Sequence, residues 1–317
     1  MTPEKIKQVE EDFYKNLTDS SGKKFHRVSV EIVTYPYGLR DINILSPDDE
    51  SYFYKETTEK KNICLHFTVG NIKSDIATLT KPNYRVSVQY IIDSSGNIYN
   101  LFPDRQWSYH LGAGAVGGNE FMSKNTIGIE LSNYGILVKS GKDLLDVYGS
   151  KYCTLKDVDK YIKGSYRGKD YYASLSKEQV LACSDLIKHL SYVHSIPIKF
   201  KENLDSVFSS NTEARNFSGI YVHSSVRKDK FDFPEFVLSS LIEEVTRNEK
   251  PLETAPTVVE YKVEKNIEKT ESEDNVDEDM DTLSVENILP KNDINITLSL
   301  IIYNLIEKLN AWLFYRK

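Results

Sequence analysis

Two histidines and one aspartate are the residues of this 317-residue chain whose types and surroundings suggest a metal site. His66 and His223 each lie in an apolar strand-like run, and Asp232 follows His223 by nine residues. Two imidazoles and one carboxylate suit a borderline cation such as zinc, and three protein ligands leave a fourth position for water. Zinc lowers the pKa of that water to about 7, which makes a nucleophile at neutral pH. On spacing alone, a metal site and a scatter of structural residues remain equal alternatives.

A hydrolytic site of this kind also needs a proton carrier and a cation that stabilises the developing oxyanion. Glu130 lies in the apolar run 125–133, where a lone acid is costly unless it has a partner or a function. Lys230 lies two residues before Asp232 and is the candidate cation. Three other histidines are interpreted as surface or helix-end residues, namely His26, His189 and His194.

The elements that would position these residues alternate between strand-like and helical patterns, which indicates a sheet with helices packed on it. Strands are predicted at 27–35, 62–69, 85–93, 125–133 and 219–225, with a hairpin signal at Asp93-Ser-Ser-Gly96. A capping box at Ser176 begins one helix, and Pro234 lies in the first turn of a second over 233–245. Residues 134–172 interrupt the pattern and are interpreted as an insertion or a lid-like connection.

Five motifs occur in the order expected of one family: Ile63-Cys-Leu-His66-Phe-Thr68, Val86-Ser-Val-Gln-Tyr-Ile-Ile-Asp93 with Gly96-Asn-Ile-Tyr99, Trp107-Ser-Tyr-His110-Leu-Gly112, Asn125-Thr-Ile-Gly-Ile-Glu130 and Gly219-Ile-Tyr-Val-His223. With Lys230-Phe-Asp232 after them, residues 60–245 resemble the zinc-dependent N-acetylmuramoyl-L-alanine amidases of the phage-lysozyme and peptidoglycan-recognition type. The resemblance implies an α/β fold with a central mixed β-sheet flanked by helices. It also implies a phage or prophage endolysin that cleaves the amide bond between N-acetylmuramic acid and L-alanine in peptidoglycan.

The same resemblance assigns roles to individual residues. It implies that His66, His223 and Asp232 bind Zn²⁺, that Glu130 is the general base and that Lys230 stabilises the transition state. It also implies a substrate groove, whose candidate residues are His110, Asn125, Gln89 and Trp107, although a structural role for His110 and Asn125 is an equal alternative. Two positions depart from the family pattern: Gln89 replaces a histidine or aromatic residue, and Asp232-Phe-Pro234 replaces Asp-Pro-Gly.

Charge and composition divide the chain into four predicted parts. Residues 1–60 are an N-terminal extension that packs near the catalytic domain of residues 61–250. Residues 251–293 carry thirteen acidic residues against four lysines, a net charge of −9, and are predicted to be a disordered acidic linker. Because the whole chain carries −7 and residues 294–317 carry +2, the body is neutral, which argues against nucleic acid as the main partner.

Residues 294–317 are predicted to form an amphipathic helix with an apolar seam of Leu298, Ile302, Leu305, Leu309 and Trp312. A membrane span is disfavoured, because Glu307 and Lys308 would lie within it. The expected partners of this helix are a second copy, in a weak homo-oligomer, or a membrane surface.

The rival functions are a non-catalytic peptidoglycan-binding module and a wall-opening component of a phage particle. The presence of both Asp232 and Glu130 favours catalysis, since non-catalytic relatives typically lack the third ligand. The N-terminus has no apolar segment of the signal-peptide type, so we expect the protein in the host cytoplasm until its release to the cell wall, or in the phage particle. Its three separated cysteines indicate neither a disulfide framework nor a thiolate zinc knuckle.

Overall fold

Successive side chains of a strand point to opposite faces of the main sheet, so that one face carries the largest hydrophobic core and the other carries His66. The computed structural model describes residues 1–34 and 38–247. On β3 (Asn62–Phe67), Ile63, Leu65 and Phe67 belong to the largest hydrophobic core. Cys64 and His66 alternate with them and therefore lie on the opposite face of the sheet.

Seven strands form one mixed sheet within the described part of the chain, in the order β1-β2-β5-β4-β6-β3-β12. Four of them run parallel to their neighbours at the centre: β4 (Tyr90–Ile92), β6 (Thr126–Leu131), β3 and β12 (Gly219–Val222). The other three complete the sheet on one side: β1 (His26–Thr34), β2 (Gly38–Ser46) and β5 (Ile98–Asn100). The parallel register places Ile91, Glu130 and His66 in one row across the sheet, on one face.

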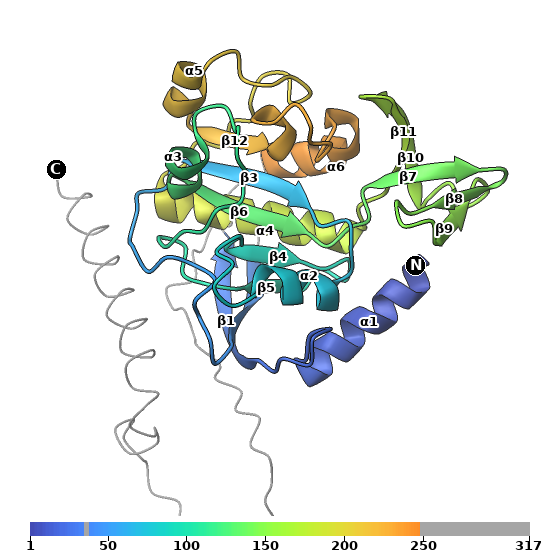
Figure 1. Cartoon of the computed structure of the whole chain (residues 1–317), viewed down its shortest axis with the longest axis horizontal. Helices are drawn as coiled ribbons and strands as arrows, with labels where there is room; N and C mark the ends of the chain where they lie inside the picture. The colour runs from blue at the N-terminus through green and yellow to red at the C-terminus, as the bar shows by residue number, and fades with distance from the viewer. Residues whose placement is uncertain (35–37, 248–317) are drawn as a thin grey trace, which may run out of the picture. The chain divides into compact units, whose positions relative to one another are not determined.

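Helices cover both faces of this sheet (Figure 1). On the Ile63 face lie α4 (Lys177–His194) and α6 (Glu235–Thr246), whose apolar residues complete the largest core. On the His66 face, α1 (Pro3–Asn16) and α2 (Ile72–Leu79) cover one part of the sheet. Two short helices, α3 (Asn119–Lys124) and α5 (Asn211–Asn216), contribute to the core around Cys64. The predicted fold class, a central mixed sheet flanked by helices, is confirmed.

A second, antiparallel sheet is inserted between β6 and α4, with the strand order β10-β11-β7-β8-β9. Its strands are β7 (Ile136–Ser140), β8 (Asp143–Leu145), β9 (Lys151–Thr154), β10 (Tyr161–Tyr166) and β11 (Lys169–Ala173). This sheet accounts for the interruption predicted at 134–172. Ile6 of α1 packs into its core, so the N-terminal helix joins the two sheets.

Several boundaries differ from the expected ones. The strand predicted at 85–93 is reduced to β4, and the strand predicted at 219–225 ends at Val222, where the chain enters a 3-10 turn (His223–Ser225). His223 therefore lies just after a strand rather than inside one. Strand β2 was not expected from the sequence, whereas the hairpin between β4 and β5 and the Ser176 N-cap of α4 are confirmed. The reciprocal half of the predicted capping box is absent, because the Gln179 side chain donates to the carbonyls of Ile92 and Ser132 instead.

The chain divides into two units, Met1–Asn266 and Ile267–Lys317, and every described residue belongs to the first. The predicted linker (251–293) and C-terminal helix (294–317) lie outside the described residues. Among the helices of residues 1–34 and 38–247, none combines the length and the apolar character needed to cross a bilayer.

Candidate metal centre

Three side chains from separate segments meet on the His66 face of the main sheet. His66 comes from β3, His223 begins the turn after the neighbouring strand β12, and Asp232 lies at the end of the loop that follows. The backbone N–H of Ser224 donates to the carbonyl of Asp232 at 2.9 Å, which returns the loop to its starting point. Residues 157 positions apart in the chain are thus neighbours because parallel strands end at one edge.

The ligand atoms of these three residues converge. The Nδ1 atoms of His66 and His223 are 3.0 Å apart, and Oδ2 of Asp232 lies 3.2 Å from Nδ1 of His223 and 3.5 Å from Nδ1 of His66. Donors bound to a tetrahedral zinc at about 2.0–2.2 Å lie roughly 3.3–3.6 Å from one another. The spacing and the two-nitrogen, one-oxygen donor set therefore fit a zinc ion.

Burial and charge give His66 and Asp232 the protonation states that metal binding requires. All three residues are buried. Burial and the nearby His223 lower the pKa of His66 to about 4, so its imidazole is neutral at neutral pH. Burial alone would raise the pKa of Asp232, but the nearby charge of His223 and hydrogen bonds from both histidines hold it well below its usual value. A neutral imidazole and an ionised carboxylate are the forms that bind metals.

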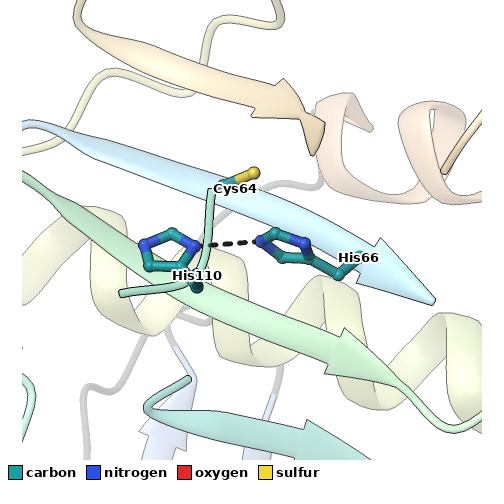
Figure 2. A group of neighbouring side chains, drawn as sticks. All are labelled: Cys64, His66 and His110. Carbon is teal, nitrogen blue, oxygen red and sulfur yellow. Dashed lines mark hydrogen bonds between the residues drawn. The ribbon is translucent and has the colours of Figure 1, made fainter. Parts of the chain in front are cut away.

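His110 contacts His66, one of the three candidate ligands, through a hydrogen bond between their rings (Figure 2). Nδ1 of His110 lies 3.0 Å from Nε2 of His66, and the two rings meet edge to face. Burial, followed by the two other histidines, lowers the pKa of His110 well below its usual value. Nδ1 of His66 faces His223 and Asp232, and metal binding through its lone pair requires the proton on Nε2, where Nδ1 of His110 can accept it in a hydrogen bond.

A second group of possible ligands, Cys64, His66 and His110, shares His66 with the first. Figure 2 shows Cys64 on the same strand as His66, with His110 opposite. Burial raises the pKa of the Cys64 thiol well above its usual value, so this sulfur is protonated, whereas the thiolate is the metal ligand. The set of His66, His223 and Asp232 is therefore the better metal site. From the sequence, Cys64 was only one of three separated cysteines and its place beside His66 was not predicted, although a spacing of two on a strand puts both side chains on one face.

Glu130 lies beside His66 in the parallel register of β6 and β3. The residue is half-buried, yet its Oε2 atom is buried and has no hydrogen-bond partner among the described residues. Burial raises the pKa of Glu130 well above its usual value, and the negative charges of Asp232 and Asp75 add to this effect. The positive charge of Lys230 opposes it, and the same charge lowers the pKa of His66, so Lys230 lies within electrostatic reach of both residues.

The remaining groove candidates are held by other partners. Gln89 is buried: its Oε1 accepts from the backbone N–H of Gly128 at 2.8 Å, and its Nε2 donates to the carbonyl of Gln106 at 2.9 Å. The amide of Asn125 donates to the carbonyl of Phe121 at 2.8 Å. These two side chains thus have structural contacts, and their contact with substrate stays a prediction.

Trp107 is also largely enclosed. Its ring is buried and stacks on Tyr54 at 4.2 Å between centroids, while the ammonium group of Lys124 lies 4.9 Å from the ring centroid. Its Nε1–H donates to Glu56 at 2.9 Å. These contacts hold the ring in place, and direct contact between Trp107 and substrate likewise stays a prediction.

Comparison with known proteins gives one family match. A family model described as N-acetylmuramoyl-L-alanine amidase matches residues 56–232, more than half of the chain and a range that includes all three candidate ligands. No curated protein matches the chain.

Three solved structures illustrate weaker likenesses. The N-acetylmuramyl-L-alanine amidase AmiD from E. coli, in complex with the substrate anhydro-N-acetylmuramic acid-L-Ala-D-gamma-Glu-L-Lys, is 21% identical over 60% of this chain and 59% of its own, with a TM-score of 0.38. The amidase LysC from Clostridium intestinale URNW is 12% identical over 63% and 96%, with a TM-score of 0.35. Staphylococcus aureus hydrolase AmiA is 16% identical over 64% and 82%, with a TM-score of 0.36. The chain thus spans less than two thirds of AmiD, and TM-scores below 0.5 support no conclusion about substrate.

Proposed function

Since the chain belongs to the N-acetylmuramoyl-L-alanine amidase family, we propose that it hydrolyses the amide bond between N-acetylmuramic acid and L-alanine in peptidoglycan, with zinc as its metal. The observation that carries this proposal is the convergence of Nδ1 of His66, Nδ1 of His223 and Oδ2 of Asp232 within 3.5 Å of one another. A zinc ion bound there would supply a Lewis acid that polarises the amide carbonyl and acidifies water.

Glu130 is the proton carrier in this proposal. Hydrolysis of an amide requires that the attacking water loses a proton and that the departing nitrogen gains one. The buried, unpartnered Oε2 of Glu130 lies in the row of His66, and burial raises the pKa of this carboxyl group, which makes its carboxylate a stronger base than that of an exposed glutamate. Glu130 takes the proton from water as the carbon–oxygen bond forms and returns it to the nitrogen as the carbon–nitrogen bond breaks.

Lys230 supplies a positive charge that stabilises the product of the first step, the addition of water. When water adds to the carbonyl carbon, negative charge develops on the carbonyl oxygen. Lys230 is half-buried, and its positive charge affects the pKa of both Glu130 and His66, so it lies within electrostatic reach of a partly buried site. A charge in such surroundings stabilises the oxyanion more than it would in bulk water.

The direct test is digestion of purified peptidoglycan, with and without a chelator. We expect turbidity to fall only without chelator, activity to return on addition of zinc, and the released peptides to begin with a free L-alanine amino group. His223→Ala should abolish the reaction, whereas His26→Ala, at an exposed histidine, should not change it. New reducing sugar ends would indicate a different hydrolase, and binding without cleavage would indicate the non-catalytic module instead.

An endolysin role, with release from the host cytoplasm to the cell wall or delivery in a phage particle, is a further part of the proposal. It is supported only by the resemblance of the sequence motifs to phage enzymes. Lysis from within and from without, compared on intact cells, would test it.

A further inference from the structure

The inserted sheet contacts the loop that connects two of the three candidate metal ligands. The β10–β11 hairpin of this sheet packs against α6, the helix that follows Asp232 (Figure 1). The rings of Tyr172 and Phe236 meet edge to face at 5.5 Å, and Gly164 approaches Phe236 so closely that an added Cβ would lie 2.6 Å from its ring. The hairpin is therefore fixed against the same helix that ends the loop.

The tip of this hairpin presents one arginine to the loop. Tyr166 pairs with Lys169, which leaves Arg167 and Gly168 as a two-residue turn with φ values of 50° and 76°. Positive φ at both positions is the requirement of a tight turn of the type I′ class, which matches the twist of the strands. The Arg167 guanidinium also packs against the Tyr166 ring at 4.8 Å, so its direction is fixed by its own hairpin.

The Arg167 guanidinium donates hydrogen bonds to four backbone carbonyls of one loop. Nη1 of Arg167 donates to the carbonyl oxygens of Arg227 at 3.1 Å and Lys228 at 2.8 Å, and also to that of Lys230. Nη2 donates to the carbonyl oxygen of Ser224 at 3.3 Å. These four residues span the segment between His223 and Asp232, and one of them is the candidate oxyanion-stabilising lysine.

We propose that Arg167 is a positioning residue, which holds the 224–230 loop in the shape that places Lys230 and Asp232 at the metal centre. A guanidinium suits this task because it carries five N–H donors in a rigid plane and keeps its charge, whereas an ammonium group is a single point with three donors. The inserted sheet then braces the active-site loop through Arg167, beside the packing of the Lys169 ammonium group over the Phe231 ring at 6.0 Å. The inference rests on the proposed function for its catalytic part, and on the metal site alone for its structural part.

Three variants test this role: Arg167→Ala, Arg167→Lys and a control, Arg27→Ala. Arg27 also packs on a tyrosine, Tyr14, and donates to a backbone carbonyl, but far from the loop in sequence. Zinc affinity is measured by chelator competition, kcat and KM on peptidoglycan fragments, and loop order by hydrogen exchange of the 224–231 amides. Groups that orient metal ligands are typically worth about 10–100-fold in affinity or activity.

We expect Arg167→Ala to weaken zinc binding and lower kcat by roughly 10–100-fold, with KM within about twofold of the wild type. The amides of residues 224–231 should exchange hydrogen faster, while those of β10 and β11 should remain as protected as in the wild type. Arg167→Lys should recover part of each loss, and Arg27→Ala should match the wild type. In a Lys230→Ala background, the kcat loss from Arg167→Ala should shrink, because part of it acts through Lys230.

Two results would overturn the inference: unchanged zinc affinity in Arg167→Ala, or faster exchange confined to the hairpin itself. If the wild type binds zinc but cleaves no peptidoglycan, the proposed function fails. The positioning role is then still judged by zinc affinity and exchange, so the two failures are distinguishable.

Discussion

Glu130 and His66 are neighbours in register, yet the proposed chemistry gives them separate tasks, one moving a proton and the other holding a metal. Replacement of Glu130 by glutamine keeps the size of the side chain and removes its proton exchange. We therefore expect Glu130→Gln to retain one zinc per chain and to lose about 10²–10⁴-fold in turnover. Elemental analysis and single-turnover digestion measure the two quantities separately. Turnover near the wild-type rate would make Glu130 a structural residue.

His110 allows a sharper test at the same scale, because it touches a ligand without belonging to the best donor set. Its Nδ1 holds Nε2 of His66 at 3.0 Å, and its own Nε2 is buried without a hydrogen-bond partner among the described residues. His110→Ala should weaken zinc affinity by roughly 10–100-fold without removing the site. His26→Ala is the matched control, since His26 is exposed. Equal zinc affinities in the two variants would show that His110 does not orient His66.

At the scale of elements, Asp75 ties α2 to the ends of β3 and β6. Its Oδ2 accepts hydrogen bonds from Thr68 at 2.8 Å and from Ser132 at 2.6 Å. Burial raises the pKa of Asp75 from 3.8 to about 7, even though these hydrogen bonds oppose the change. The folded protein therefore keeps this proton to a higher pH than the unfolded chain does.

The sign of the resulting pH dependence follows from this difference. The contribution of Asp75 to the free energy of unfolding is largest below about pH 4, falls as the pH rises to about 7, and is constant above that. Asp75→Asn removes the titration. In metal-free protein, the wild type should therefore lose stability relative to the variant as the pH rises from about 4 to 8. The difference between their free energies of unfolding should fall by a few kcal/mol, because each unit of pKa shift corresponds to about 1.4 kcal/mol. Urea titrations at several pH values measure it, with the exposed Asp159→Asn as control. A difference that does not change with pH would contradict the raised pKa.

The same scale shows which parts of the structure the sequence could predict. Local patterns sufficed for β1, for the hairpin between β4 and β5, and for α4 with its Ser176 cap, because alternation, turn residues and capping act over a few positions. The five strands of the inserted sheet also carried local signals, since Gly141, Gly149 and Gly168 each occupy a turn with positive φ between strands. These glycines mark hairpins that the sequence reading left as one connection.

For the candidate site, the sequence predicted the ligands and the catalytic residues but not the residues that position them. Motif order identified the three candidate ligands, Glu130 and Lys230, and the structure places the ligands together. The contacts of His110 with His66 and of Arg167 with the 224–230 loop join residues 44 or more positions apart. No pattern within a strand or turn encodes such pairs, because they depend on how β3, the inserted sheet and the loops pack in three dimensions.

At the scale of the whole molecule, the decisive question is how much of the chain the site needs. The buried residues of the four hydrophobic cores all lie between Ile6 and Val245, at the last turn of α6. Residues 251–293 contain a single aromatic residue, Tyr261, and a net charge of −9, so they offer little apolar surface for a core. Burial, rather than position in the sequence, decides which truncations a domain tolerates.

We therefore expect a chain that ends at residue 250 to fold, to bind one zinc, and to digest peptidoglycan at a rate within about twofold of the full chain. Its free energy of unfolding should change by no more than about 0.5 kcal/mol, as for changes that leave buried groups untouched. Urea unfolding, zinc content and digestion of purified peptidoglycan check the three parts. A shorter chain, which ends at residue 240, is the control. It lacks Leu241 and Val245 of the largest core and should therefore not fold. Aggregation of the 1–250 chain, or loss of its zinc, would mean that the acidic segment or the apolar seam beyond it completes the domain.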